Sequence, residues 1–99
     1  MPWYFMVDTY IDGEKGRGMY DEYIRQVKPI VERCGGTYLA RTEQVASLSE
    51  KRAPQRVILI RFDTRERLEA CFASAEYRAI LSKRTESVDS RAIIVEGIE

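Results

Sequence analysis

The segment that most constrains the fold is Arg56–Phe62, which reads Arg-Val-Ile-Leu-Ile-Arg-Phe. Four consecutive β-branched or aliphatic residues are typical of a buried β-strand. Successive side chains point to opposite faces of a strand, which places Val57 and Leu59 on one face and Ile58, Ile60 and Phe62 on the other. Both faces need cover, but a chain of 99 residues with two helical segments covers one of them. We therefore expect a second copy to cover the other face, which predicts a homodimer.

Related patterns predict the remaining elements. Aromatic and β-branched residues predict a strand at Trp3–Ile11, and apolar residues at three- and four-residue spacing predict a helix at Met19–Cys34 that ends at Gly35. The later elements are a strand at Thr37–Leu48, the strand Gln55–Phe62, a helix opened by a capping box at Asp63–Glu66, a short continuation capped by Ser74, and a strand at Arg91–Val95.

The order strand, helix, strand, strand, helix, strand is that of a ferredoxin-like α+β fold. We expect one domain over residues 1–99, with a four-stranded antiparallel sheet and both helices on one face. The glycine-rich segment Asp12–Gly18 lacks the spacing of a Walker motif, so it predicts a surface loop and not a phosphate-binding loop.

Charge and residue usage exclude several classes of function. Sixteen basic and sixteen acidic residues cancel, so the basic excess of a nucleic-acid binder is missing. No apolar run is long enough to cross a membrane, and the amino terminus lacks the basic region of a secretory signal. Cys34 and Cys71 read as reduced, buried residues, which indicates a cytoplasmic protein. The chain has no histidine, so we expect no metal, no haem and no cofactor.

Tyrosine and arginine carry the chemistry that remains. Tyr20 and Tyr23 lie three apart on the helical face expected to meet the sheet, and a buried tyrosine hydroxyl needs a partner. Arg41, Arg61 and Glu96 fall within predicted strands, so some of them must point into a buried or interfacial space. Convergence of these groups would form a pocket for a small acidic or aromatic compound. The alternative is a set of core tyrosines and buried ion pairs that only hold the dimer.

The ordered set Tyr20-x-x-Tyr23, Gly35-Gly36-x-x-Leu39-x-Arg41, Arg56–Phe62, Ser74-Ala-Glu-Tyr77 and Val95-Glu96-Gly97 resembles the domain of unknown function 1330 family over nearly the whole chain. The resemblance implies a dimeric α/β barrel, in which two ferredoxin-like units pack sheet to sheet. It implies no agreed enzymatic activity. Ala75 stands where the family often has proline, which affects only a local turn.

The resemblance supplies candidate ligand-binding residues, namely Tyr23, Arg41, Ser74, Tyr77 and Arg84. Our first hypothesis is a small dimeric protein that binds or transforms a small organic molecule, with Arg41 or Arg84 on an anionic group and Tyr23 and Tyr77 orienting it or relaying a proton. The second is a non-catalytic interaction module. The sequence leaves open whether the chain is an enzyme. The superfamily also holds cofactor-free monooxygenases and haem enzymes, but fold alone does not transfer their functions.

Overall fold

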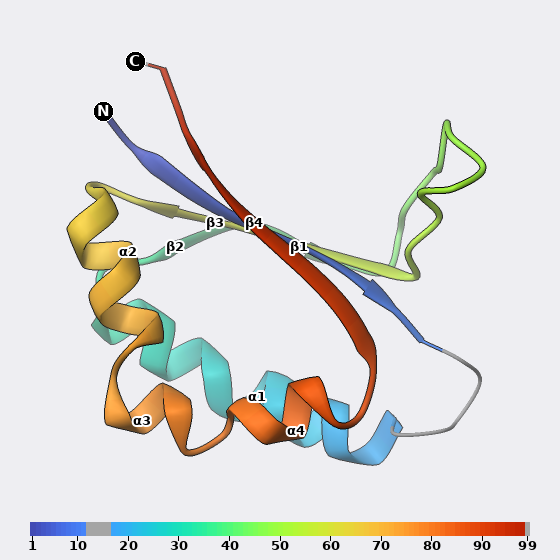
Figure 1. Ribbon diagram of the computed structural model, residues 1–99, viewed down its shortest axis with the longest axis horizontal. Helices are drawn as coiled ribbons and strands as arrows, with labels where there is room; N and C mark the ends of the chain where they lie inside the picture. Colours follow the sequence, from blue (N-terminus) through green and yellow to red (C-terminus); the bar gives the residue numbers. More distant parts are fainter. Residues whose placement is uncertain (12–16, 99) are drawn as a thin grey trace.

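The computed structural model describes residues 1–11 and 17–98. Its elements are, in chain order, β1 (Trp3–Tyr10), α1 (Arg17–Arg33), β2 (Thr37–Thr42), β3 (Arg56–Phe62), α2 (Arg65–Phe72), α3 (Ala75–Arg78), α4 (Leu81–Thr85) and β4 (Asp89–Glu96). The strands form one antiparallel sheet in the order β2-β3-β1-β4. All four labelled helices lie on one side of it (Figure 1). The predicted ferredoxin-like α+β fold is confirmed.

Several predicted boundaries are wrong. The second strand ends at Thr42 instead of Leu48, because the polar residues that follow leave the sheet. The last strand begins at Asp89 instead of Arg91. Gly18 belongs to α1 and not to a loop. The rest of the predicted glycine-rich loop, residues 12–16, lies outside the described residues.

The helices begin and end where local hydrogen bonding allows. Gly35 has a φ of 92°, a left-handed conformation that glycine adopts without strain, and it ends α1 as predicted. Helix α2 is capped by Thr64, whose side chain accepts a hydrogen bond from the backbone N–H of Arg67. The expected capping box at Asp63–Glu66 is therefore wrong, and the cap is the side chain of Thr64, one residue later. Ser74 caps α3, as predicted.

One face of β3 meets the helices and the other does not. Ile58, Ile60 and Phe62 are buried against the helical layer. Val57, Leu59 and Arg61 point to the opposite face. Arg61 forms an ion pair of 2.6 Å with Asp63, so this charge has the partner that its position in the strand required.

A β-bulge in β2 changes the direction of Arg41. Tyr38 pairs with Ile60 and Ala40 pairs with Leu59, which leaves Leu39 as the extra residue. Residues three apart in a regular strand point to opposite faces, but a bulge reverses this. Arg41 therefore lies on the helix side with Tyr38, and its guanidinium sits 5.5 Å from the centre of the Tyr38 ring.

The face of the sheet without helices carries an apolar centre. Met6 of β1 lies between Leu59 of β3 and Ile93 of β4 in register, and Ile93 is 57% exposed. Residues 43–55, which we call the arm, rise from one end of this face, and both chain termini rise from the other (Figure 1). We refer to this surface as the open face and to its opposite as the covered face.

Candidate functional site

A polar row crosses the covered face at the end of the sheet nearest the arm. Thr9 of the central strand β1 pairs in register with Arg56 of β3 and with Ser90 of β4. Thr9 lies on the same face as the core residue Val7, because the two are two residues apart in one strand. Three neighbouring strands thus present one threonine, one arginine and one serine toward the helices, next to the apolar core residues Val7 and Ile58.

Helix α1 covers this row with a tyrosine. The Tyr20 hydroxyl lies 3.5 Å from Thr9 Oγ1, and the two residues are each 1% exposed. Burial raises the pKa of Tyr20 above its ordinary value, against the opposing effects of the Thr9 hydrogen bond and the Arg56 charge. Tyr20 is therefore a neutral hydrogen-bonding group at neutral pH.

Two arginines end at this row, and each has an unsatisfied N–H. Arg84 of α4 donates from Nη1 to Ser90 Oγ at 3.2 Å. Arg56 lies 3.5 Å from Glu43 and 6.0 Å from the centre of the Tyr20 ring. The Nε atoms of both arginines are buried and have no hydrogen-bond partner among the described residues. An unpaired buried donor is costly, so each of these N–H groups is suited to donate a hydrogen bond to a ligand oxygen.

Charge balance distinguishes the two arginines. Arg56 shares the carboxylate of Glu43 with Arg17, whose ion pair with that carboxylate is 2.9 Å long. Arg84 has no carboxylate within ion-pair distance in the part of the chain that the structure describes. Arg84 is consequently the partly buried positive charge with the greater need for an anion.

Tyr23 and Tyr77 lie next to this row and bond to each other. Their hydroxyl oxygens are 2.9 Å apart, and their rings meet edge to face with centres 6.3 Å apart. Burial, followed by the charge and hydrogen bond of Tyr77, raises the pKa of Tyr23 far above its ordinary value, while Arg84 acts in the opposite direction. The Tyr23 phenol therefore stays protonated, which suits a hydrogen bond and does not suit a general base.

The other two predicted residues have structural partners. Arg41 donates from Nη2 to the carbonyl of Ile24 at 3.0 Å, so it joins β2 to α1. Ser74 accepts from the N–H of Tyr77 and donates to the carbonyl of Cys71 at 2.7 Å, so it fixes the junction of α2 and α3. The structure thus brings Tyr23, Tyr77 and Arg84 into one region. Arg41 and Ser74 instead form hydrogen bonds that hold neighbouring elements together.

Sequence reasoning missed Thr9, Arg56 and Ser90 as site residues. Strand alternation gave a usable signal for two of them, because Thr9 shares a face with Val7 and Arg56 shares a face with Ile58. Ser90 gave none, because the predicted last strand begins one residue later, at Arg91. Strand pairing alone joins these three residues.

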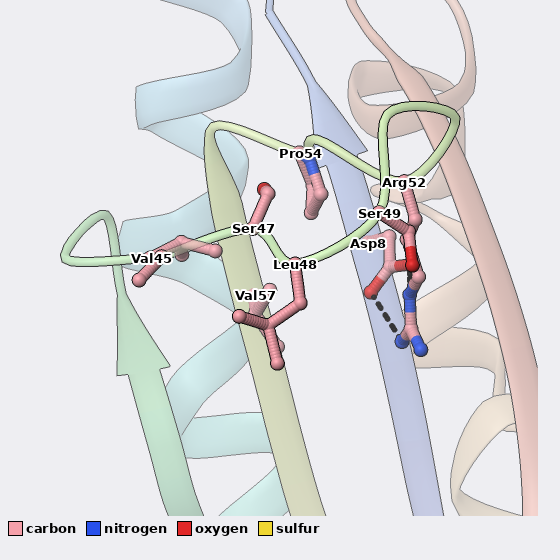
Figure 2. A pocket seen from close by; sticks show the side chains of 9 residues that line it. Asp8, Val45, Ser47, Leu48, Ser49, Arg52, Pro54 and Val57 are labelled. Atoms are coloured by element: carbon pink, nitrogen blue, oxygen red, sulfur yellow. Dashed lines mark hydrogen bonds and ion pairs between the residues drawn. The ribbon is translucent and has the colours of Figure 1, made fainter.

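A hollow of about 340 Å³ lies on the open face, away from these residues. It is bounded by the arm, by Val57 of β3 and by Asp8 of β1, and Figure 2 shows Asp8 joined to Arg52 of the arm. No metal-ligand cluster of histidine, cysteine, aspartate or glutamate occurs among residues 1–11 and 17–98. No helix in that part of the chain is long and apolar enough to cross a membrane.

The fold and this layer of tyrosine and arginine define a class of protein, the ferredoxin-like α+β proteins with one open sheet face. Within it, the chain belongs to the family described as domain of unknown function DUF1330, whose model matches residues 4–98. The resemblance found in the sequence is thereby confirmed. No curated protein matches the chain.

Solved structures from three organisms share the fold. A protein of unknown function from Rhodopseudomonas palustris is 18% identical, with a TM-score of 0.82 over 99% of this chain and 83% of its own. A dimeric ferredoxin-like protein of unknown function from Jannaschia sp. CCS1 is 15% identical, with a TM-score of 0.75 over 98% and 100%. A putative antibiotic biosynthesis monooxygenase from Nitrosomonas europaea is 14% identical, with a TM-score of 0.69 over 98% and 90%. At these identities the likeness shows the fold alone.

Proposed function

We propose that this protein binds a small organic anion, such as a carboxylate, between the sheet and helices α1 and α4. The observation that carries the proposal is the buried Nε–H of Arg84, which has no acceptor, on a guanidinium without a carboxylate partner among the described residues. A guanidinium binds a carboxylate best through two parallel N–H groups, and the free Nε–H of Arg84 supplies one of them.

The neighbours of Arg84 suit the organic part of such a molecule. Tyr23 and Tyr77 offer aromatic surface and one shared hydroxyl pair. Ser90 and Thr9 offer hydroxyl groups along the polar row. This combination favours a compact anion with an apolar or aromatic body. The protonated state of Tyr23 favours binding over proton abstraction by that residue.

A panel of small carboxylates at constant ionic strength tests the proposal by thermal unfolding. A ligand at ten times its Kd stabilises a protein by about 1.4 kcal/mol, which raises the Tm of a domain of this size by roughly 6–11 °C. We expect at least one carboxylate to raise the Tm of the wild type and to have no effect on Arg84→Gln. Arg78→Gln, which changes an exposed arginine of α3, is the control and should respond like the wild type.

Arg41→Ala separates a binding role from a structural one. Because Arg41 bonds the Ile24 carbonyl, we expect this variant to unfold at a lower temperature but to keep the ligand-induced rise. Equal ligand responses in the wild type and Arg84→Gln would show that the anion binds elsewhere.

One observation favours the competing function, a non-catalytic interaction module. Tyr23 and Tyr77 already satisfy each other, and both are almost fully buried. In that case no carboxylate in the panel would change the Tm of the wild type at millimolar concentration, and Arg84→Gln would change only stability.

We also propose that the protein acts as a homodimer in the cytoplasm. The exposed apolar centre of the open face supports the dimer, and the dimeric Jannaschia protein offers a precedent in the same fold. Two free cysteines support the reducing compartment. Light scattering should give twice the chain mass of 11.5 kDa. A monomer at micromolar concentration would contradict the dimer.

A further inference from the structure

The arm, residues 43–55, is held in a fixed position over the open face. Arg52 donates to both carboxylate oxygens of Asp8, from Nε at 2.6 Å and from Nη2 at 3.1 Å. The backbone N–H of Gln55 donates to the carbonyl of Thr9 at 3.0 Å, and Ser49 and Arg52 form an isolated β-bridge within the arm. These contacts join the arm to β1 at two points, so its position relative to the sheet is defined.

The hollow beside the arm has apolar residues in its lining, next to the polar residues Asp8, Ser47, Ser49 and Arg52. Val45, Leu48 and Pro54 of the arm and Val57 of the sheet line the hollow of about 340 Å³ (Figure 2). A hollow of this size with apolar residues in its lining can bury apolar side chains of a partner.

Leu48 shows that the arm lacks an internal packing partner. It is 101% exposed, the highest value among the large hydrophobic residues of the described chain. A single exposed leucine is ordinary on a protein surface. Leu48, however, lines this hollow in an arm that is bonded to β1, and it lies on the same side of the sheet as the exposed Ile93. The three features together indicate a docking surface and not a solvated loop.

The sheet alone is small for a stable dimer. Four strands at about 4.8 Å spacing, each with about seven residues at about 3.3 Å, give a face of roughly 440 Å². Stable interfaces bury about 800 Å² on each partner. The arm rises from one end of this face (Figure 1), so it adds contact surface to that of the sheet.

We propose that the arm is the element that docks a second copy of this chain, with Leu48 packed against the partner and apolar side chains of the partner seated in the hollow. This inference rests on the homodimer proposed above and adds the contact on which its affinity depends. Two-fold symmetry uses the same contact twice, so each substitution acts at two places in one dimer.

Sedimentation equilibrium on four proteins tests the inference. The wild type should be a dimer at micromolar concentration. Leu48→Glu should raise the dissociation constant at least 100-fold, because it places a carboxylate at both contacts. Leu48→Ala should raise it about tenfold. Met19→Glu, which changes an exposed apolar residue of α1 on the helix side, should assemble like the wild type.

The outcomes separate this inference from the homodimer itself. Since Leu48 is fully exposed in the single chain, Leu48→Glu should keep the circular dichroism spectrum of the wild type. If Leu48→Glu dimerises like the wild type while Ile93→Glu dissociates, the open face forms the dimer without the arm and the inference is wrong. If the wild type itself is monomeric, both proposals fail. A hollow that serves a small apolar ligand would also leave the assembly of Leu48→Glu unchanged.

Discussion

The two faces of the sheet are built from similar residues but are closed to different extents. On the covered face, Ile58, Ile60 and Phe62 are at most 5% exposed. On the open face, Leu59 is half-buried and Ile93 is exposed. The amphipathic stripe of α1 accounts for the difference, because one helical layer can cover one face only. Apolar strand composition therefore shows that both faces need cover, and the helices decide which face the chain covers by itself.

Each face of the sheet carries a few residues whose polarity differs from that of their surroundings, and the two sets support different proposals. The covered face is mostly apolar, but it carries the row of Thr9, Arg56 and Ser90, where the Nε–H groups of two arginines have no partner among the described residues. The open face is exposed, yet its centre is apolar. The unpaired donors of the covered face support the proposed ligand, and the exposed apolar residues of the open face support the proposed partner.

The largest expected difference between the faces is in the cost of removing a large side chain. Phe62 is 0% exposed and contacts the ring of Phe72 edge to face, so Phe62→Ala should lower the free energy of unfolding by about 3–5 kcal/mol. Leu59→Ala should cost clearly less in the Leu48→Glu background, where the open face is uncovered. Urea unfolding at pH 7 measures both.

Protein concentration provides the control for this comparison. In the wild-type background, the cost of Leu59→Ala should depend on protein concentration, because the dimer contributes to it. The cost of Phe62→Ala should include a part that does not depend on protein concentration, because Phe62 is buried within a single chain. An equal, concentration-independent cost for the two substitutions would show that the open face is closed within one chain.

A smaller effect is expected from an added methyl group at two glycines. A Cβ on Gly36 would lie 2.6 Å from Val31 Cγ1 and 2.9 Å from Phe62 Cζ, and both side chains are fully buried on the covered side. Gly36→Ala should therefore destabilise the protein by about 1–3 kcal/mol. A Cβ on Gly97 would lie closer still to Cε2 of Tyr4 on the open face. Because Tyr4 is half-buried while Val31 and Phe62 are fully buried, we expect Gly97→Ala to cost less.

Gly18→Ala is the matched control for the two glycine variants. No atom lies within 4 Å of the added methyl group, and alanine in a helix is favoured over glycine by up to about 1 kcal/mol. The expected order of Tm is Gly18→Ala, then Gly97→Ala, then Gly36→Ala. A lower Tm for Gly97→Ala than for Gly36→Ala would show that the open face is the more rigid one.

Most of the fold was predictable because its signals are local. Strand alternation in Arg56–Phe62, the stripe of α1 and the cap at Ser74 each depend on residues close in sequence. The end of β2 was not predictable, because Thr42 and the polar residues after it have similar propensities. The bulge at Leu39 was not predictable either, since it is a property of pairing with β3. This bulge places Arg41 on the helix side of the sheet, where it donates a hydrogen bond to the carbonyl of Ile24.

The candidate site was predictable only in part, for the same reason. Tyr23 and Tyr77 face inward by helical periodicity and a local cap, so their positions follow from the sequence. Their hydrogen bond does not, because 54 positions separate them in the chain. The row formed by Thr9, Arg56 and Ser90 depends on the register of three strands, which no single segment encodes.

The closed state of the covered face has a further consequence at alkaline pH. Burial raises the pKa of Tyr38 to about 12 and that of Tyr23 further still, from an ordinary value of 10.0. A raised folded-state pKa gives stability that is complete below pH 10 and decreases above it, because only the unfolded chain then releases the proton. Tyr23 should lower the free energy of unfolding by about 1.4 kcal/mol for each pH unit above 10, and the less deeply buried Tyr38 should lower it by less.

Tyr23→Phe isolates this effect. The variant should be less stable than the wild type at pH 8, because it leaves the Tyr77 hydroxyl without its partner. Its free energy of unfolding should then fall less steeply between pH 10 and 12, by about 1.4 kcal/mol per unit. Leu68→Ala, which also weakens the core but removes no titratable group, should keep the wild-type slope. Equal slopes for the wild type and Tyr23→Phe would mean that the Tyr23 phenol ionises in the folded protein, so the covered face would be open to water at this point.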